Sequence, residues 1–348
     1  MKAEYKKHKL IFKTPGGTSR GILNTKDTYF IVIREGDKTG IGECGLFKGL
    51  SCDDRPDYES TLNWVSDHIH LGMDELYQTL TEFPSIQSGV ETAFRSINPT
   101  TPFEIFPSDF TKGNKGIDIN GLIWMGEWGY MKEQITQKLK EGFRCIKMKI
   151  GAIDFNAEMD LLRSIRNEFS SSEIELRVDA NGAFDPSEAM EKLKRLSEMD
   201  IHSIEQPIKQ RQWQEMARLC EDSPIPIALD EELIGVFSEE NKIRLTETIK
   251  PQYIILKPSL IGGFKGSDSW IDLAIKYKIG WWITSALESN IGLNAISQYT
   301  FTKNSKLPQG LGTGGLFNNN IPSSLVVSNG KLYYDTNLEW DIRILNSK

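Results

Sequence analysis

Five charged residues recur at a regular interval in the second half of the chain, each at the end of a short apolar segment. In chain order they are Lys149, Asp179, Glu205, Asp230 and Lys257, and the steps between them are 30, 26, 25 and 27 residues. Each step has the length of one strand followed by one helix. Such regular spacing predicts that repeated strand–helix units carry the five side chains to one common place.

The three acidic residues of this series indicate a metal site. Carboxylates that are packed together repel one another unless a cation lies among them, and their oxygen atoms suit a hard divalent ion. We therefore predict that Asp179, Glu205 and Asp230 bind Mg²⁺, or Mn²⁺ in its place. A metal ion that takes a substrate carboxylate, with a lysine amine nearby, is suited to removing the proton from the adjacent carbon. The predicted chemistry is thus proton abstraction from a small-molecule carboxylate substrate.

The segment from Arg144 to Gly151 predicts a buried strand with two lysines on one face. Apolar residues alternate there with Lys147 and Lys149, and side chains two residues apart on a strand point to the same side. Burying an unpaired ammonium group is costly, so both lysines need carboxylates or an anionic substrate facing them. The lysine pair and the acidic residues therefore belong to a single predicted site.

Short apolar segments alternate with helical patterns from Gly116 onward. Strands are expected at residues 117–124, 144–151, 174–178, 203–204, 226–229, 253–256 and 281–284, with a last short segment at 311–317. This alternation predicts a parallel sheet, and seven or eight units within about 200 residues favour a closed barrel over an open sheet. The C-terminal ends of barrel strands converge on one mouth, where active sites are built. An Asp before Asn-Gly is often only a turn former. The regular spacing of all five charged residues along the chain nevertheless favours a functional site.

The first 112 residues predict a separate α+β domain. Strands are expected at residues 9–14, 27–34 and 39–44, with a hairpin turn at 35–37, and helices at 58–70 and 85–97. A proline- and glycine-rich connection from Pro99 to Gly116 marks a boundary. We therefore expect a first domain at residues 1–112, a barrel at 113–320, and a C-terminal segment at 321–348 that returns to the first domain.

Composition and charge exclude several classes of protein. The 348 residues carry a net charge of −7 without a long basic run, which argues against binding to nucleic acid or to an anionic membrane. No apolar run is long enough for a membrane span or a signal-peptide core, so we expect a cytoplasmic protein. The four cysteines show no paired metal-ligand spacing and are expected to be free thiols. The oligomeric state cannot be read from the sequence pattern.

Several motifs resemble those of the enolase superfamily, in its muconate-lactonising subgroup. They are KMK at 147–149, DAN at 179–181, EQP at 205–207, LDEE at 229–232, and LKP with LIGG at 256–263. The resemblance covers the whole barrel and implies a modified TIM barrel of the (β/α)7β type with an N-terminal α+β capping domain. It also implies that Lys149 is the base, that Lys147 supports it electrostatically, and that Lys257 stabilises an enediolate from the opposite face.

Within the subgroup, three segments resemble the o-succinylbenzoate synthases of menaquinone biosynthesis. They are NGLIWMG at 120–126, SALESNIGL at 285–293 and GLGTGGLFNNN at 310–320. The implied reaction is the syn dehydration of 2-succinyl-6-hydroxy-2,4-cyclohexadiene-1-carboxylate to 2-succinylbenzoate. Glycine lets backbone N–H groups approach an anion closely, and the implied loop at 45–51 would close over the substrate as a lid. The candidate substrate contacts are Ser285, Gly312, Gly314 and Asn181, of which Asn181 equally suits a turn.

Two alternatives stay open on the sequence alone. An N-acylamino acid racemase or a dipeptide epimerase of the same superfamily would use Lys149 and Lys257 equally well, as two bases on opposite faces. Dipeptide epimerases usually hold the substrate ammonium with acidic residues in the last barrel segment, and residues 311–317 contain none. A non-catalytic binding barrel is disfavoured, because inward charges without a function would only cost stability. Glu231 and Glu232 receive no role.

Overall fold

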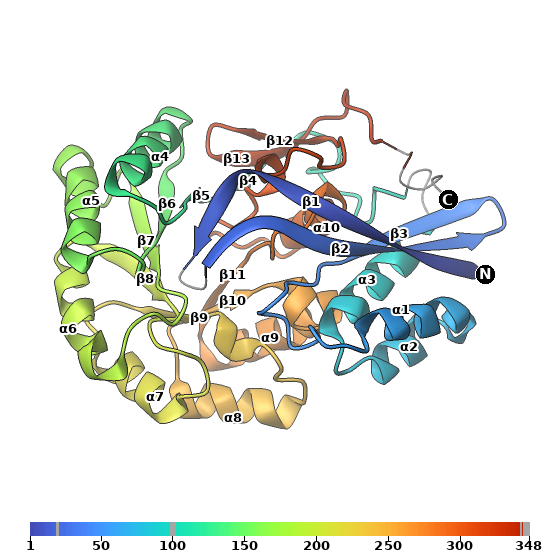
Figure 1. The fold of residues 1–348 in the computed structure, drawn as a ribbon, viewed down its shortest axis with the longest axis horizontal. Coiled ribbons are helices and arrows are strands. Elements are labelled where there is room, and N and C mark those ends of the chain that lie inside the picture. Colours follow the sequence, from blue (N-terminus) through green and yellow to red (C-terminus); the bar gives the residue numbers. More distant parts are fainter. Residues whose placement is uncertain (19–20, 98–101, 342, 344–348) are drawn as a thin grey trace.

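The computed structural model describes residues 1–18, 21–97, 102–341 and 343. A barrel of parallel strands surrounded by helices forms one part, and an antiparallel sheet with helices packed on it, built from the N-terminal residues, forms the other (Figure 1). This arrangement confirms the predicted α/β fold, a modified TIM barrel with an N-terminal α+β capping domain. Pro99 and the last residues of the predicted C-terminal segment, 344–348, lie outside the described residues.

Within the described residues, seven parallel strands form the barrel wall, in the spatial order β11-β10-β9-β8-β7-β6-β5. Their bounds are β5 (Gly121–Ile123), β6 (Cys145–Lys149), β7 (Glu175–Asp179), β8 (Ile201–Glu205), β9 (Ile227–Leu229), β10 (Tyr253–Leu256) and β11 (Gly280–Ile283). Each strand is followed by a helix: α4 (Trp128–Lys140), α5 (Phe155–Glu168), α6 (Pro186–Ser197), α7 (Trp213–Asp222), α8 (Glu239–Ile249), α9 (Gly263–Tyr277) and α10 (Asn290–Thr302). The apolar faces of these helices pack on fully buried strand residues such as Met148, Val178 and Ile204.

The barrel closes through a short stretch at the eighth strand position. Gln309 and Gly310 lie there, and they form isolated bridges to Ile119 on one side and to Thr284 on the other. The eighth position therefore comes just before the segment predicted at 311–317, which begins with a turn in the structure. A stretch of two residues is too short to show the alternation of apolar and polar residues by which strands are recognised in a sequence.

The capping domain is a three-stranded antiparallel sheet with helices packed against it. Its elements are β1 (Lys2–Thr18), β2 (Gly21–Glu35), β3 (Lys38–Cys44), α1 (Tyr58–Asp67), η1 (Ile69–Leu71), α2 (Met73–Thr79) and α3 (Pro84–Arg95). Strand β3 approaches α3 closely, because Gly42 has no side chain where a Cβ would come within 2.0 Å of the carbonyl oxygen of Gly89. Strands β1 and β2 are both longer than the sequence pattern predicted.

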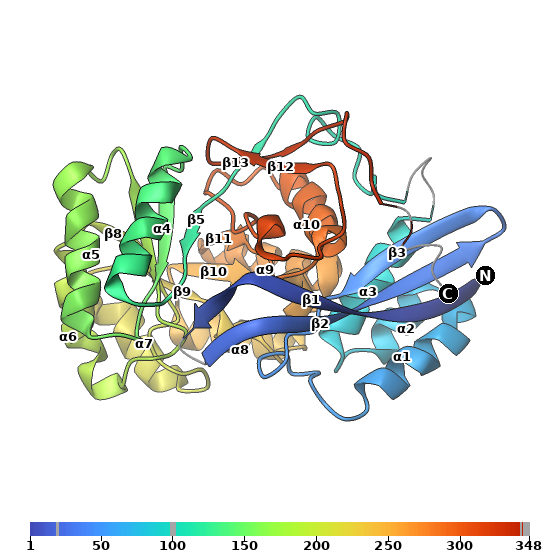
Figure 2. The ribbon, with the colours of Figure 1, turned by 45° about the horizontal axis from the view of Figure 1, so that its top comes forward.

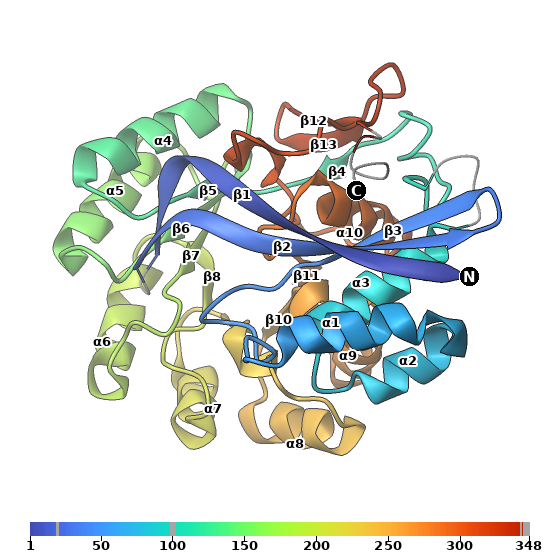
Figure 3. The ribbon, with the colours of Figure 1, turned by 45° about the vertical axis from the view of Figure 1, so that its right-hand side comes forward.

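The extra length of β1 and β2 forms a ribbon that runs from the capping domain over the barrel. All three views show it crossing from the region of α1 and α3 toward β5 (Figure 1, Figure 2 and Figure 3). Near its far end, the amide of Met125 donates a 3.3 Å hydrogen bond to the carbonyl oxygen of Gly17. The indole of Trp124 lies against Gly16, where an added Cβ would come within 3.1 Å of the ring. The ribbon thus brings capping-domain residues to the ends of the barrel strands.

The C-terminal residues contact both parts of the molecule. β12 (Leu325–Ser328) pairs with β13 (Lys331–Tyr334), and β13 pairs with β4 (Ile117–Asp118) at the start of the barrel. Farther along, Trp340 stacks on Phe103 with ring centroids 4.3 Å apart, beside buried apolar residues of β2 and β3. Of the helices in the described part of the chain, none has both the length and the apolar character needed to cross a membrane.

Candidate active site

The five charged residues of the regular series lie together at the C-terminal end of the barrel. Lys149, Asp179 and Glu205 are the last residues of β6, β7 and β8, and they are direct neighbours in the register of these strands. Asp230 and Lys257 come directly after the last residues of β9 and β10. The three carboxylates are at most 2% exposed. The predicted convergence is therefore present, and it occurs in a buried setting.

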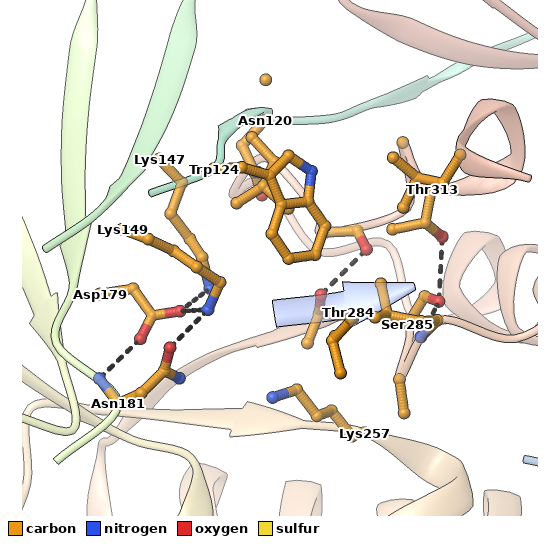
Figure 4. A pocket seen from close by; sticks show the side chains of 18 of the residues that line it. Asn120, Trp124, Lys147, Lys149, Asp179, Asn181, Lys257, Thr284, Ser285 and Thr313 are labelled. Atoms are coloured by element: carbon orange, nitrogen blue, oxygen red, sulfur yellow. Dashed lines mark hydrogen bonds and ion pairs between the residues drawn. The ribbon is translucent and has the colours of Figure 1, made fainter. Parts of the chain in front are cut away.

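Lysine ammonium groups pair with the buried carboxylates. Lys147 Nζ lies 2.9 Å from Oδ2 of Asp179 and also forms an ion pair with Glu205. Lys149 Nζ lies 2.8 Å from the same oxygen of Asp179 (Figure 4). Lys257 pairs in the same way with the carboxylate that follows β9. Each of the three carboxylates thus has an ammonium group as a partner, which offsets much of the cost of burying each charge alone.

These contacts shift the pKa values of the buried groups in different directions. Burial opposes the ionisation of Asp179, but the ammonium groups of Lys147 and Lys149 hold its pKa below the ordinary value. Burial also opposes the charge of Lys147, yet Asp179 and Glu205 outweigh this effect and raise its pKa. For Glu205, burial and then the neighbouring charge of Asp179 raise the pKa well above the ordinary value. The lysines alone therefore do not fully compensate the negative charge of Glu205.

The donor set fits a divalent metal ion. Oε1 of Glu205 is buried, and no described residue hydrogen-bonds it. Carboxylate oxygens are the donors that Mg²⁺ and Mn²⁺ prefer, and a cation beside them would balance the negative charge that the lysines leave over. In the geometry shown, no three His, Cys, Asp or Glu side chains of the described residues converge as metal ligands. The ammonium group of Lys147 lies between Asp179 and Glu205 and separates these two donors.

Neutral amide side chains orient the charged groups. Asn181, which has a positive φ of 45°, accepts a 2.7 Å hydrogen bond from Lys149 and donates a 3.0 Å bond to Glu231. Gln206 is fully buried, donates to Glu232 at 3.0 Å, and accepts from two backbone amides of the segment after β9. The two acidic residues that the sequence left without a role are therefore hydrogen-bond partners of these amides. They lie in the short helix η2 (Glu231–Leu233).

A cavity of about 200 Å³ lies in front of these groups (Figure 4). Its polar end is formed by Lys147, Lys149, Asp179, Asn181 and Lys257. Its apolar wall includes Leu23 of β2, Phe47 and Leu50 of the loop at 45–51, and Leu122, Trp124, Leu287 and Leu316 from the barrel side. The capping domain and the barrel thus share the wall of the cavity, and the loop suggested as a lid lies directly at it.

Of the four candidate substrate contacts, three line the cavity. Asn181, Ser285 and Gly312 are at its surface, whereas Gly314 is not among the lining residues. Gly314 begins the short helix η4 (Gly314–Leu316), where an added Cβ would come within 2.7 Å of the side-chain oxygen of Asn290. Gly314 therefore shapes the loop beside the cavity and does not face the cavity itself.

The sequence pattern does not single out three further lining residues, Asn120, Trp124 and Thr313. Figure 4 shows Asn120 beside Trp124 at the cavity, and the Asn120 side chain is 6% exposed. The ring of Trp124 meets that of Phe12 edge-on, with centroids 6.4 Å apart. Asn120 and Trp124 flank β5. Their position directly before and after the first barrel strand is a signal by which the sequence could have identified them as cavity residues. Thr313 lies in a glycine-rich loop, and nothing in the pattern distinguishes it from its neighbours.

A buried carboxylate also supports the turn that follows Lys149. Oε1 of Glu158 accepts a 2.7 Å hydrogen bond from the amide of Gly151, and burial raises the pKa of Glu158 to about 7. The folded protein therefore keeps this proton to a higher pH than the unfolded chain, so its contribution to stability falls as pH rises from about 4.5 to about 7. Relative to Glu158→Gln, the free energy of unfolding of the wild type is expected to fall by up to about 3 kcal/mol as the pH rises through this range. Urea unfolding of both proteins at pH 5 and pH 8 measures the difference, and parallel pH profiles would contradict the prediction.

Comparison with known proteins places the chain in a family. Residues 130–336, more than half of the chain, match the family model described as Enolase C-terminal domain-like. The o-succinylbenzoate synthase of Desulfotalea psychrophila (strain LSv54 / DSM 12343) is 47% identical over an alignment of 368 positions, which covers 95% of this chain and 98% of the relative. The crystal structure of MenC from Desulfotalea psychrophila LSv54 has a TM-score of 0.85 at 42% identity, covering 96% of this chain and 99% of that chain.

More distant relatives share the architecture. A dipeptide epimerase from Enterococcus faecalis V583, solved with Mg and the dipeptide L-Leu-L-Tyr, has a TM-score of 0.82 over 96% of each chain, at 18% identity. At that level of identity the likeness shows the fold alone, whereas the similarity to the synthase extends over nearly the full length of both proteins. The chain belongs to the enolase superfamily and, within it, to the o-succinylbenzoate synthase family.

Proposed function

We propose that the protein converts 2-succinyl-6-hydroxy-2,4-cyclohexadiene-1-carboxylate to 2-succinylbenzoate, the dehydration step of menaquinone biosynthesis. The observation that carries the proposal is the set of lysines and carboxylates on the ends of β6 to β10, in a chain similar to an o-succinylbenzoate synthase along nearly its whole length. The substrate is a small carboxylate. Its reacting carbon is the one that bears the ring carboxylate.

Lys149 is the proposed base. As a neutral amine it takes the proton from the carbon next to the carboxylate, and the electron pair of that bond moves into the carboxylate to form an enediolate. The hydroxyl group on the neighbouring ring carbon then leaves with the proton that Lys149 returns to it, so one water is released and the ring becomes aromatic. Because one side chain serves both steps, the proton and the hydroxyl leave from the same face. Such proton transfer contributes about 10² to 10⁴ in rate.

The remaining charged groups stabilise the negative charge of the enediolate. Lys257 enters the cavity from the end of β10, away from the lysine strand β6 (Figure 4), and is the proposed cation for this charge. Lys147 adds positive charge beside Lys149. Charges that are already in position cost no reorganisation when the reaction occurs, which makes this type of stabilisation effective.

Asp179, Glu205 and Asp230 are the proposed ligands of Mg²⁺, with Mn²⁺ as its substitute. The proposal is supported by buried carboxylates on neighbouring strands and by the Oε1 atom of Glu205, which no described residue hydrogen-bonds. When bound, the ion supplies positive charge for the substrate carboxylate and for the enediolate. Asn181 and Gln206 keep the surrounding carboxylates in fixed positions.

The rest of the cavity holds the substrate and excludes water. Asn181, Ser285 and the backbone at Gly312 border the proposed substrate position, and Gly314 shapes the adjoining loop. The apolar wall around Trp124 suits the carbon ring. The loop at 45–51, which contributes two apolar residues to the wall, is the proposed lid.

We also propose the domain limits 1–112, 113–320 and 321–348, and the cytoplasm as the location, since free buried thiols suit a reducing compartment.

An ultraviolet assay tests the proposed function. The purified protein with Mg²⁺ and the hydroxycyclohexadiene substrate is expected to form the aromatic product, and chelation of the metal is expected to stop the reaction. The uncatalysed loss of water in the same buffer provides the baseline. If the wild type formed product no faster than this baseline with Mg²⁺ or Mn²⁺, the substrate assignment would be wrong.

Racemisation of N-acylamino acids is the second candidate. It is favoured by the two lysines, Lys149 and Lys257, which reach one cavity from different strands. Incubation of N-succinylamino acids in deuterated water would show it as exchange of the α-proton. Dipeptide epimerisation is disfavoured, because Asp179 is the one acidic residue among the described residues that line the cavity, and it is paired with lysines. The ammonium group of a dipeptide would find no free carboxylate there.

A further inference from the structure

A group of buried charges that the proposed reaction does not use lies where the capping domain meets the barrel. It consists of Lys26 on β2, Glu43 on β3, and Glu288, which follows β11. Their exposed fractions are 8%, 2% and 0%, and the charge of Lys26 acts on both carboxylates. Burying three charges costs folding free energy. Their contacts show what the arrangement achieves.

Glu288 connects two segments of the active-site end of the barrel. Its Oε1 accepts a 2.6 Å hydrogen bond from Ser259, and its Oε2 accepts a 2.6 Å bond from Ser285. Ser259 stands two residues after Lys257, in the short helix η3 (Pro258–Leu260), and Ser285 lines the cavity. A single carboxylate therefore joins the end of β10 to the end of β11.

The hydroxyl group of Ser285 depends on this carboxylate for its orientation. A hydroxyl has one proton to donate, and Ser285 donates it to Glu288. The same oxygen accepts a 3.0 Å bond from Thr313 and a 2.9 Å bond from the amide of Leu287. Glu288 thereby decides which face Ser285 presents to the cavity.

The capping domain supplies the other half of the group. Glu43 accepts a 2.7 Å bond from Thr28, and 2.9 Å bonds from the amides of Ser289 and Gly292 at the start of α10. Its negative charge is thus satisfied by hydrogen bonds at a helix N-terminus. Lys26 Nζ, by contrast, is buried and is hydrogen-bonded by none of the described residues. Burial lowers the pKa of Lys26, and the charges of Glu43 and Glu288 oppose this effect through space.

The contact between the two domains is tight at this point. A Cβ at Gly45 would lie 2.7 Å from Oγ of Ser259 and 3.0 Å from Oε1 of Glu288. Gly45 begins the loop whose apolar residues line the cavity. Burial raises the pKa of Glu288, and the ammonium group of Lys26 opposes this effect. Loss of Lys26 would therefore favour a neutral Glu288, which has a different pattern of hydrogen bonds.

We propose that Glu288 is a positioning residue of the active site and that Lys26 of the capping domain is its counter-charge. Together they hold the segments that carry Lys257 and Ser285 in place when the capping domain is docked on the barrel. The capping domain then contributes a positioning charge in addition to part of the cavity wall. The kinetic part of this inference rests on the proposed function, and its structural part does not.

A double-mutant cycle tests the pairing of the two residues. Glu288→Gln and Lys26→Met are each expected to lower kcat of the dehydration about tenfold, with a smaller change in KM, and the double variant is expected to resemble Glu288→Gln within about twofold. Lys242→Met is the matched control, because Lys242 is also buried, at 4% exposure, but lies on α8 outside the cavity lining. It should stay within about twofold of the wild type. If the two single effects multiplied in the double variant, the residues would act independently and the proposal would be wrong.

Hydrogen–deuterium exchange provides a readout that needs no substrate. Peptides covering residues 256–260 and 285–288 are expected to exchange about tenfold faster in Glu288→Gln and in Lys26→Met, and unchanged in Lys242→Met. Unchanged exchange in a folded Glu288→Gln would overturn the proposal. If Glu288→Gln does not fold, Ser259→Ala removes one of its contacts, and unchanged exchange at 256–260 in that variant would overturn it equally. An inactive wild type would count against the proposed function, and the exchange experiment would still decide the positioning role.

Discussion

Replacing Lys149 with alanine is expected to lower kcat of the dehydration by about 10³-fold, with a much smaller change in KM. The amine of Lys149 is the proposed acceptor of the α-proton and the donor to the leaving hydroxyl, so both steps lose their proton carrier. The fold should persist, because Asp179 keeps its 2.9 Å contact with Lys147. Steady-state kinetics in the ultraviolet assay, together with circular dichroism of the variant, measure these two effects.

Lys149→Arg separates proton transfer from electrostatics. Arginine keeps the positive charge, but its pKa above about 12 prevents it from acting as a base near neutral pH. The arginine variant is therefore expected to be nearly as inactive as the alanine variant. If it retained more than about one tenth of the wild-type kcat, Lys149 would act mainly through its charge, and the base would have to be sought elsewhere.

Replacing Glu205 with glutamine is expected to affect the metal-free and the metal-loaded protein in opposite directions. Glu205 is buried beside Asp179 and Asp230, whose charges oppose its ionisation. Without metal, the neutral glutamine should leave the free energy of unfolding unchanged or raise it by up to about 2 kcal/mol. With Mg²⁺ at about 100 times its dissociation constant, the free energy of unfolding of the wild type should rise by about 2.7 kcal/mol, and that of the variant should not rise. Because Glu205→Gln is expected not to bind the ion, this variant should also lose its activity.

Thermal unfolding in chelator and in Mg²⁺ measures both effects on the same samples. Glu232→Gln is a suitable control, because Glu232 is buried next to the same segment but is hydrogen-bonded to Gln206 and Trp213. This control should keep the rise in Tm that Mg²⁺ causes. If Mg²⁺ raised the Tm of Glu205→Gln as much as that of the wild type, the ion would have to bind at a site that does not include Glu205.

The sequence by itself determined the barrel and the central charges of the site. Residues at successive strand ends, such as Asp179 and Glu205, are each positioned by a local strand–helix unit, and repetition of that unit brings them side by side. Lys147 and Lys149 share a face because of strand periodicity alone. For this reason the spacing in the chain was sufficient to predict that these residues lie together, and the structure places them side by side at the strand ends.

Tertiary structure alone decided the features that depend on contacts between distant segments. The two-residue stretch at Gln309 closes the barrel through its neighbours and not through any pattern of its own. The capping ribbon reaches Trp124 because β1 and β2 are longer than their apolar alternation indicates. Lys26 and Glu288 are 262 positions apart, and nothing local in either segment specifies the other. Their meeting follows from how the capping domain packs on the barrel, because packing of separate surfaces is set by their complementary shape and charge and not by a sequence period.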